Sequence, residues 1–458
     1  MSTQSTQNQQ ASTDAIEGAI VPTFFKYLIP SLLGLIAMTS ASLVDGFFIG
    51  NYVGVTALAA VNLIIPILTI LFGVGMMLSI GGSVRGGKYL GEGDEEAASA
   101  IFSKTLISLA IYGFIVISLG MVFEEQMFAG LGATQELFPI MGEYFRIIMP
   151  FFFAQFAMIV LYFFIRLDGL PSLAAASLAA GAVINFVLDY LFIAVYDWGL
   201  TGAAFATGIS QTIPLLVMLY YFFWPKRRLK FSFRQKNWKE IFLAAYNGIS
   251  EFINEISGGI IAFIFNWMMI QRGGIEGVAA ITVVNYLLLL GFMVFFSISD
   301  TIQVILSQNF GARQKTRIED FLKIAAWLIL LLSSLFIVAL LMLSEPLILL
   351  FVDEQSGEKM VTMASELIAY VWPLFFFAGA NMLISGYLTA IHLPFQSGSV
   401  ALCRSLIMPG GFLFLLYFLL SDYRFVAALA AAEAATFVIA LIIFARHTPF
   451  KALFAKDK

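Results

Sequence analysis

The chain has 458 residues, of which 60% are hydrophobic and only 12% charged, and its formal net charge is −4. Soluble globular proteins have about 45–50% apolar and about 25% charged residues, so a water-soluble fold and a disordered chain are both excluded. The small negative charge gives no basic excess for nucleic acid, and the single cysteine permits no intrachain disulfide.

The chain begins with a polar segment and continues with twelve apolar runs. Residues 1–20 are rich in Ser, Thr and Gln and lack a positively charged n-region, so they are predicted to form a disordered tail and not a signal peptide. A helix needs roughly 20 apolar residues to cross the hydrocarbon core, and each run is long enough. The runs do not alternate with period two, which excludes a β-barrel. They cover residues 24–49, 55–81, 101–123, 140–165, 172–196, 200–224, 241–270, 277–306, 321–343, 361–388, 396–420 and 424–446. The predicted fold class is an all-α integral membrane protein with twelve transmembrane helices.

A basic segment divides the chain near its midpoint. Residues 225–240, between the sixth and seventh runs, contain seven Lys and Arg residues. By the positive-inside rule, this linker and both termini, including the tail at 448–458, are predicted to lie in the cytoplasm. The two lobes are then 21–224 and 241–447, with six spans each, in what we expect to be the inner membrane of a bacterial-type cell.

The two lobes are predicted to be repeats of one another. An offset of 220 residues aligns Gly54 with Gly274, and an offset of 223 aligns Pro150 with Pro373. Six spans are an even number, so both lobes have the same topology. Such six-helix bundles are related by a pseudo-two-fold axis along the membrane normal, with a substrate path between them near the midplane. This organisation favours an alternating-access carrier.

The first lobe contains ionisable groups within its apolar runs. Asp45 lies late in the first run, and Asn185 and Asp189 lie in the fifth run at i, i+4, on one helical face. A charge in lipid costs at least ~2.5–3.5 kcal/mol, so these side chains are expected to face a cavity and handle ions. A polar pair satisfied by the backbone is the structural alternative. The offsets place Phe265 opposite Asp45 and Phe412 opposite Asp189, which predicts an apolar, aromatic substrate cleft in the second lobe.

The second lobe has its own acidic pair near the start of the seventh run. Glu251 and Glu255 are also spaced i, i+4 and share one face. Because they lie close to the basic linker, a solvated helix start is an equal alternative for Glu251. Glu255 is one turn deeper and favours a functional role. Both are secondary candidates for cation coupling.

Enzymatic and ATP-driven functions find no support in the motifs. Gly82–Lys88 matches the first part of a phosphate-binding loop, but Tyr89 replaces the required Ser or Thr and the segment follows a membrane run instead of a strand. The two histidines, His392 and His447, form no zinc motif and offer a serine nucleophile no credible partner. We therefore expect no enzyme, no ATP and no cofactor other than a coupling ion.

The apolar runs contain several short motifs, which are Pro30 with Leu43–Gly50, Leu58–Ala60, Glu143–Pro150 with Tyr144, Asn185–Asp189 and Gly202–Thr207. Glu433 lies in the last run. Each motif is weak alone, but jointly they are specific. Over essentially the whole chain they resemble the multidrug and toxic compound extrusion (MATE) transporters, in which a glutamate like Glu433 is often found in the last helix.

The resemblance implies export of amphipathic, often cationic small molecules in exchange for H⁺ or Na⁺. In the branch of the family with a carboxylate cluster in the first lobe, Asp45, Asn185, Asp189 and Thr207 form the coupling site and Tyr144 lies nearby. Desolvation disfavours the anion of a buried Asp45, which would let it take up H⁺ near neutrality. The four side chains could instead supply the hard oxygen ligands that a Na⁺ needs. The partners implied are the drug and the lipid bilayer, and we expect a monomer.

Pro30 provides a position at which the first predicted helix can bend. It lies fifteen residues before Asp45 in the first run, removes one backbone hydrogen bond and permits the helix to bend. Cation binding would change the preferred bend and lower substrate affinity. A lipid-linked oligosaccharide flippase of the wider superfamily is the alternative function. It needs several cations for a pyrophosphate, and only Arg146 and Arg404 lie more than one helical turn from the end of a run. A channel would reveal itself by single-channel conductance.

Overall fold

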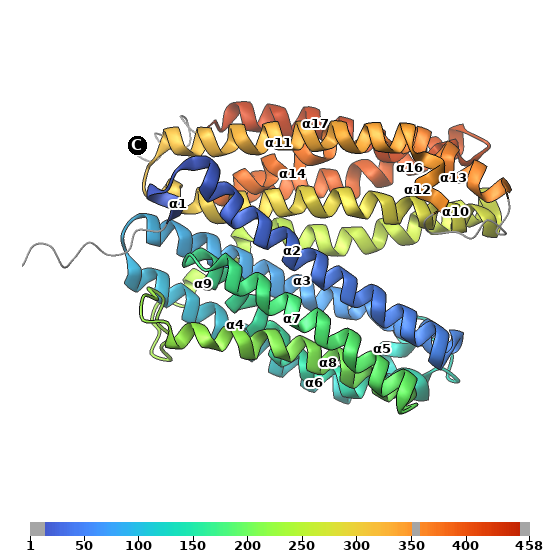
Figure 1. Ribbon diagram of the computed structural model, residues 1–458, viewed down its shortest axis with the longest axis horizontal. Coiled ribbons are helices and arrows are strands. Elements are labelled where there is room, and N and C mark those ends of the chain that lie inside the picture. Colours follow the sequence, from blue (N-terminus) through green and yellow to red (C-terminus); the bar gives the residue numbers. More distant parts are fainter. Residues whose placement is uncertain (1–13, 350–357, 449–458) are drawn as a thin grey trace, which may run out of the picture. The chain divides into compact units, whose positions relative to one another are not determined.

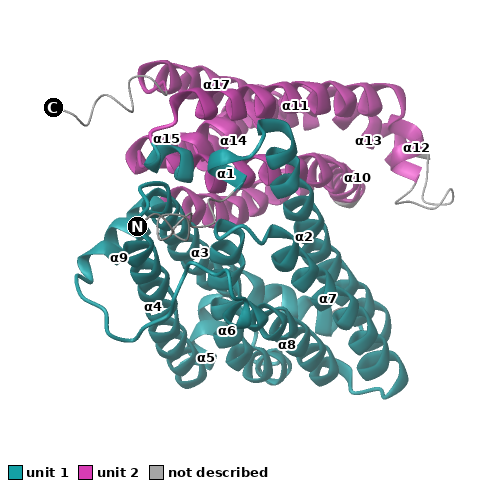
Figure 2. Ribbon diagram, turned by 60° about the vertical axis from the view of Figure 1, so that its left-hand side comes forward, with its two compact units in different colours: residues 1–248, 307–312 teal, residues 249–306, 313–458 magenta. Residues whose placement is uncertain are grey.

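The computed structural model describes residues 14–349 and 358–448 and consists of helices joined by short connections (Figure 1). Within this part of the chain, eleven helices are long and apolar enough to cross a membrane, and one bent helix pair can supply a twelfth span. The prediction of an all-α membrane protein with twelve spans is confirmed. The chain forms two compact units, coloured separately in Figure 2.

Unit 1 contains residues up to 248 together with 307–312. Its central helix is α6, which packs against α3, α4, α7 and α8, while α2 packs along α7. Because α6 has neighbours on all sides, apolar side chains surround it, and residues 158–167 are buried without exception. The helices are α1 (Asp14–Glu17), α2 (Ile20–Phe48), η1 (Ile49–Val53), α3 (Val55–Gly91), α4 (Glu95–Val122), α5 (Glu124–Gly130), α6 (Phe138–Leu167), α7 (Pro171–Asp189), η2 (Tyr190–Val195), α8 (Gly199–Met218), η3 (Leu219–Phe223) and α9 (Lys239–Asn247).

Unit 2 contains residues 249–306 and the chain from 313 onward. Its helix α14 packs against α11, α15 and α17, and α17 also packs against α16. The bent pair is α13 and α14, whose axes differ by 52° across Pro373, a residue that cannot donate the backbone hydrogen bond of a continuous helix. The helices are α10 (Ile249–Gly311), α11 (Lys315–Met342), α12 (Ser344–Leu349), α13 (Glu358–Val371), α14 (Leu374–Ala390), α15 (Pro394–Leu402), η5 (Cys403–Ile407), α16 (Met408–Leu419), η6 (Tyr423–Ala427) and α17 (Ala428–Arg446).

The internal repeat is visible in the backbone of the turns. Three turns of the first half place a glycine in the left-handed region, and the residue at the predicted offset in the second half does the same. At the first pair, Gly274 interrupts α10 and separates two spans, 249–274 and 276–311. The pairs are Gly54 and Gly274 (φ 119° and 62°), Gly93 and Arg313 (φ 80° and 53°), and Gly169 and His392 (φ 93° and 59°). The turns are thus similar even where the second half has another residue in place of glycine. The left-handed conformation strains an L-residue by roughly 1–2 kcal/mol.

Part of the predicted disordered tail is ordered. Asp14–Glu17 form α1, which is held to unit 1 because the Asn309 side chain donates a hydrogen bond of 2.9 Å to the Ala15 carbonyl. Lys26 adds an ion pair with Asp14. Residues 1–13 and, in the predicted C-terminal tail, 449–458 lie outside the described residues. The sequence shows no signal for this docking, because its partners are about 300 residues away.

Helix α9 packs in unit 1, although the sequence assigns its residues from 241 onward to the second lobe. The reason is a very close approach of two backbones. A Cβ built on Gly81 would lie 1.9 Å from the Ala244 carbonyl oxygen, and one on Gly248 would lie 2.0 Å from the carbonyl oxygen of Met77. Only glycine allows α3 and α9 to touch in this way.

An ionic contact fixes the start of α9 to α3 and α4. The buried Lys104 Nζ donates to Glu240 Oε2 at 2.6 Å, Tyr89 donates to the other oxygen, and Arg85 lies 3.6 Å from it. Burial raises the pKa of Glu240, but the hydrogen bonds from Lys104 and Tyr89 outweigh it, so the pKa lies below its usual value. Glu240 is therefore an anion at neutral pH and holds α9 in place.

The contact between α3 and α9 generates the first prediction. Gly81→Ala must push the two backbones apart, and overpacking of this kind costs typically about 1–3 kcal/mol. We expect a lower thermal unfolding midpoint for the purified protein in detergent. Gly258→Ala is the matched control, because a Cβ at Gly258 meets no atom within 4 Å. Equal midpoints for the two variants would contradict the close contact.

Candidate functional site

A cavity of about 400 Å³ lies inside unit 1, between α2, α3, α6, α7 and α8. Most of its wall is apolar and includes Met38, Phe72 and Met158. Amide and hydroxyl groups contribute the rest, and Asp45 is the single charged residue among those that line it. A concave, largely apolar cavity whose wall carries one negatively charged side chain is typical of a site for an amphipathic cation.

Asp45 is held in this wall by two hydrogen-bond donors from different helices. Asn185 Nδ2 on α7 donates to Asp45 Oδ1 at 2.7 Å, and Thr207 Oγ1 on α8 lies 3.0 Å from Asp45 Oδ2. The Thr207 hydroxyl also lies 3.0 Å from the Ala203 carbonyl, so its one proton is shared between two acceptors. The sequence predicted that Asp45, Asn185 and Thr207 act together, and the fold brings them together.

Asp189 lies behind Asp45 and has no access to solvent. Its exposure is 0%, and its charge interacts directly with that of Asp45. Within the described chain, neither Asp189 carboxylate oxygen has a hydrogen-bond donor, and Asn185 Oδ1 has none either. Two adjacent carboxylates in a medium of low dielectric cannot both remain charged without a compensating cation. The three oxygens therefore fit a bound proton or a hard metal cation such as Na⁺.

Tyr144 and Pro30 take different places around this pair. The buried ring of Tyr144 on α6 lies beside Thr207 and within the electrostatic range of Asp45 and Asp189. Pro30 is buried in the first half of α2, which continues through it as an unbroken helix. The neighbouring Ser31 accepts a hydrogen bond of 3.2 Å from the buried Arg166 on α6. The proposed bend point is thus anchored to the central helix.

Two π-helical turns follow the carboxylates, and the sequence gives no signal for them. α2 changes to π-helix η1 at Ile49, four residues after Asp45, and α7 changes to η2 at Tyr190, directly after Asp189. The Gly54 amide donates a hydrogen bond of 2.9 Å to the Ile49 carbonyl, five residues before it, which is the pattern of a π-helix. Such turns are frequent at functional sites because they re-aim side chains without ending the helix.

Unit 2 contains a second buried acid at the position of the secondary candidates. Glu251 is only 6% exposed and accepts a hydrogen bond of 3.2 Å from Gln303, so it is not at a solvated helix start. Asp300 and Glu255 lie near enough to interact with its charge, and Glu255 is partly exposed. A small cavity, with room for about one water, adjoins Glu251. Gln303 was not predicted as a partner of Glu251, because the sequence does not show which polar residues of different apolar runs lie close together in the fold.

Phe265 and Phe412 occupy less open positions than the predicted cleft requires. Phe265 is 4% exposed and packs edge-to-face on Phe425, with the ring centroids 6.0 Å apart, and Phe412 is partly exposed. A cavity of about 220 Å³ elsewhere in unit 2 has Phe292 in its wall. The role of the two predicted rings in a cleft stays a prediction, and Phe292 is an aromatic candidate that the repeat comparison missed.

Arg404 and Arg146 each form an ion pair within their own unit. In unit 2, Arg404 lies 3.0 Å from Glu433, whose carboxylate also accepts a hydrogen bond of 2.7 Å from Asn381. In unit 1, the exposed Arg146 donates to both oxygens of Glu124 at 2.9 and 3.0 Å. Each of these two arginines is therefore compensated by a carboxylate.

Comparison with known proteins establishes the family. A sequence model of the MatE family matches residues 30–191 and 253–409, more than half of the chain and one segment in each half. The chain belongs to the MatE family. The resemblance to MATE transporters is confirmed. MATE proteins are transport proteins, and multidrug efflux proteins are among the relatives.

Individual relatives differ in what they are said to carry. The probable multidrug resistance protein YoeA of Bacillus subtilis is 25% identical over 376 residues, which cover 78% of each chain. A protein of Shewanella oneidensis named FAD transporter is 25% identical over 397 residues, covering 83% of this chain and 84% of that one. A MOP superfamily transporter from Pyrococcus furiosus has the same fold, with a TM-score of 0.88 and 20% identity over 97% of this chain and 99% of that one.

Efflux measurements distinguish the Asp45–Asp189 cluster of unit 1 from the Glu251–Glu255 cluster of unit 2. Asp189→Asn removes one of the two adjacent carboxylates and should reduce cation-driven efflux to the level of protein-free vesicles. Glu251→Gln keeps the shape and the hydrogen-bonding capacity of its site and should retain most of the activity. Glu255→Gln should show a partial loss. Efflux from proteoliposomes measures all three, and an inactive Glu255→Gln beside an active Asp189→Asn would move coupling to unit 2.

Proposed function

We propose that the protein is a secondary active antiporter that exports amphipathic, often cationic compounds in exchange for H⁺ or Na⁺ by alternating access. One observation carries the proposal. Asp45 lines the unit 1 cavity and also interacts with Asp189. Asp189 is buried, and its carboxylate has no hydrogen-bond donor among the described residues. A single carboxylate thus faces both the space for a drug and the site for a coupling ion.

The exchange follows from competition at Asp45. Without a bound cation, the pair gives the cavity negative charge, which attracts a cationic drug. When a proton or Na⁺ occupies the pair, Asn185 and Thr207 hold Asp45 in place while its charge is neutralised. The drug then loses its counter-ion and dissociates. A ligand shifts an equilibrium only by its differential affinity, so the coupling ion must bind better to the drug-releasing state.

The same cluster links ion binding to the movement of α2. Asp45 comes from α2, whereas Asn185, Asp189 and Thr207 come from α7 and α8. Repulsion between two carboxylates separates α2 from α7, and a bound cation draws them together. Pro30 in the first half of α2 is a position where the helix can bend in response.

The alternatives fit the cavity less well. A flippase for a pyrophosphate-linked lipid needs unpaired cations, whereas Arg146 and Arg404 each pair with a carboxylate. Export of an anionic dinucleotide, as the name of the Shewanella relative suggests, needs a cationic wall, and Asp45 is the single charge lining this cavity. The basic linker at 225–240 supports a cytoplasmic position for both termini. We further propose that the protein is a monomer in the inner membrane.

Asp45→Asn tests the proposed function. The variant is isosteric and cheaper to bury than an anion, so it should fold and reach the membrane. Drug resistance conferred on a susceptible host should nevertheless disappear. In proteoliposomes, an imposed ΔpH or ΔpNa, applied separately, should drive efflux through the unchanged protein and not through the variant.

The control is a well-expressed variant outside the cluster with a similar polar change. Asp320→Asn serves, because it is the same isosteric change at a half-exposed residue of α11 that pairs with Lys323 at 3.1 Å and lies in neither cavity wall. Full resistance with Asp45→Asn at equal expression would remove Asp45 from the mechanism. Efflux that neither gradient accelerates would contradict antiport.

A further prediction concerns which ring in unit 2 contacts the drug. Phe292→Leu should change the range of exported compounds, since a ring face is worth roughly 0.5–2 kcal/mol to a cation. Phe265→Leu and Phe412→Leu conserve hydrophobicity and serve as comparisons. Resistance profiles over chemically unlike drugs measure the effect. A profile altered by Phe265→Leu or Phe412→Leu alone would place the cleft where the repeat comparison predicts it.

A further inference from the structure

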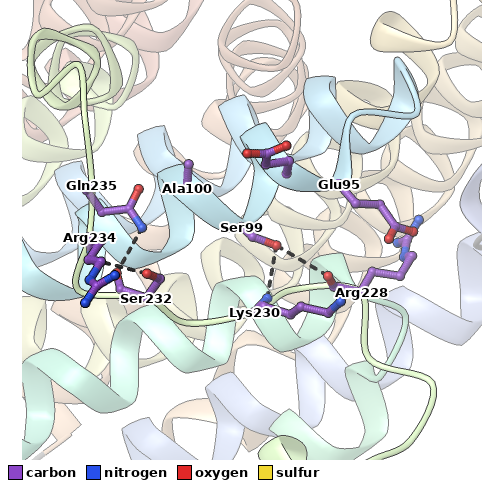
Figure 3. A pocket seen from close by; sticks show the side chains of 9 residues that line it. Glu95, Ser99, Ala100, Arg228, Lys230, Ser232, Arg234 and Gln235 are labelled. Carbon is purple, nitrogen blue, oxygen red and sulfur yellow. Dashed lines mark hydrogen bonds between the residues drawn. The ribbon is translucent and has the colours of Figure 1, made fainter.

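A second cavity of unit 1 lies at the polar end of a membrane span. Its volume is about 360 Å³, and it lies between the first turns of α4 and the chain segment 228–235 of the linker (Figure 3). The candidate span of α4 begins at Glu95, one of the residues that line the cavity. The cavity therefore opens at the level where lipid headgroups meet water.

The linker is fastened over this cavity by backbone hydrogen bonds. Ser99 on α4 donates to the Arg228 carbonyl at 3.4 Å and accepts from the Lys230 amide at 3.0 Å. Ser103, one turn further, accepts from the Ser232 amide at 3.1 Å. Arg228 is also held by Asp168, with an Nε–Oδ1 distance of 2.8 Å. The cavity thus has a fixed wall and is not a gap under a loose loop.

Charges of both signs face the cavity without pairing across it. Within the described chain, Lys230 and Arg234 form no ion pair, and Glu95 and Glu96 form none either. Figure 3 shows Glu95 and Arg234 on opposite sides of the cavity. The side chain of Arg228 is 10% exposed, and its Nη2 is buried without a hydrogen-bond partner. Two separated pairs of charges, with a buried unused donor, form a surface for a ligand that carries both a positive and a negative group.

Aromatic side chains around the cavity indicate that this ligand is a lipid. Phe233, within the same linker segment, is 80% exposed, and its ring packs edge-to-face on Phe231. Phe223, just before the linker, and Trp238, near the end of the linker, are also exposed. Large aromatic rings that are exposed in a polar segment are typical of the interface between membrane and water.

We propose that this cavity binds the headgroup of a zwitterionic phospholipid that carries a primary ammonium. The basic side chains of segment 228–234 take the phosphate, and the carboxylates of Glu95 and Glu96 accept hydrogen bonds from the ammonium. A quaternary ammonium has no N–H to donate, so a choline headgroup satisfies only half of the site. Because Asp168 compensates Arg228, the remaining charges balance, and a lipid with a purely anionic headgroup leaves both glutamates uncompensated.

Binding is tested on the purified, delipidated full-length protein with three lipids of identical acyl chains, which carry ethanolamine, choline or glycerol headgroups. Native mass spectrometry counts bound lipid, and thermal unfolding reports stabilisation. We expect the ethanolamine lipid to bind several-fold more tightly than the other two. Soluble glycerophosphoethanolamine is added in a separate arm. If it binds as well as the lipid, the ligand is a free phosphate ester and the membrane assignment is overturned.

Two double variants separate the two halves of the headgroup. Glu95→Gln with Glu96→Gln should abolish the preference for ethanolamine over choline, while Lys230→Gln with Arg234→Gln should weaken both. Lys226→Gln with Lys236→Gln is the matched control, since it removes the same charge from the linker at residues that do not line the cavity. Equal binding of the three lipids, a preference for the glycerol lipid, or unchanged selectivity in the glutamate variant would each overturn the proposal. The assay measures no transport, so it is independent of the proposed antiport.

Discussion

Two adjacent carboxylates in an apolar helix bundle, Asp189 fully buried and Asp45 lining a cavity, are the constraint on which the rest of unit 1 depends. Asp45 and Asp189 come from different helices, and neither can leave its place without moving α2 or α7. Asn185 and Thr207 satisfy Asp45, but the described chain provides no donor for Asp189. In the proposed function, a bound cation would supply the missing partner of Asp189 and would also change the charge of the cavity.

Much of the fold and part of the site follow from the sequence, for identifiable reasons. Burial of a charge in lipid is so unfavourable that Asp45 and Asp189 stand out in any apolar run, and the i, i+4 spacing places Asn185 on the same face as Asp189. The π-helical turns at Ile49 and Tyr190 could not be predicted, because they depend on packing and not on local residue preferences. Glu251 shows the other limit. Its position beside the linker favours exposure, and only its distant partner Gln303 reveals burial.

The repeat has kept its turns while its polar groups have diverged. Arg313 and His392 have a left-handed backbone where the first half has glycine. The free energy gained from the direction that the chain takes at these turns therefore exceeds the cost of the local backbone strain. Polar side chains in the spans have not been kept in the same way. Unit 1 places Asp45 on α2 and Asp189 on α7, whereas unit 2 places Glu251 and Asp300 on α10. Comparison of equivalent positions therefore identifies the scaffold, and it does not identify the aromatic ring at the unit 2 cavity.

The close approach of α3 and α9 has a consequence for how such a chain can be divided. The basic linker looks like the natural crossover point for chimeras between relatives, because it separates two runs of six spans. A crossover there would pack α3 from one parent against α9 from the other. At this contact the two backbones leave no room for a Cβ atom. The interchangeable modules are the compact units, so a crossover belongs after residue 248, and residues 307–312 must come from the same parent as α3. Exchange between family members is thus limited by glycines that do not line the unit 1 cavity.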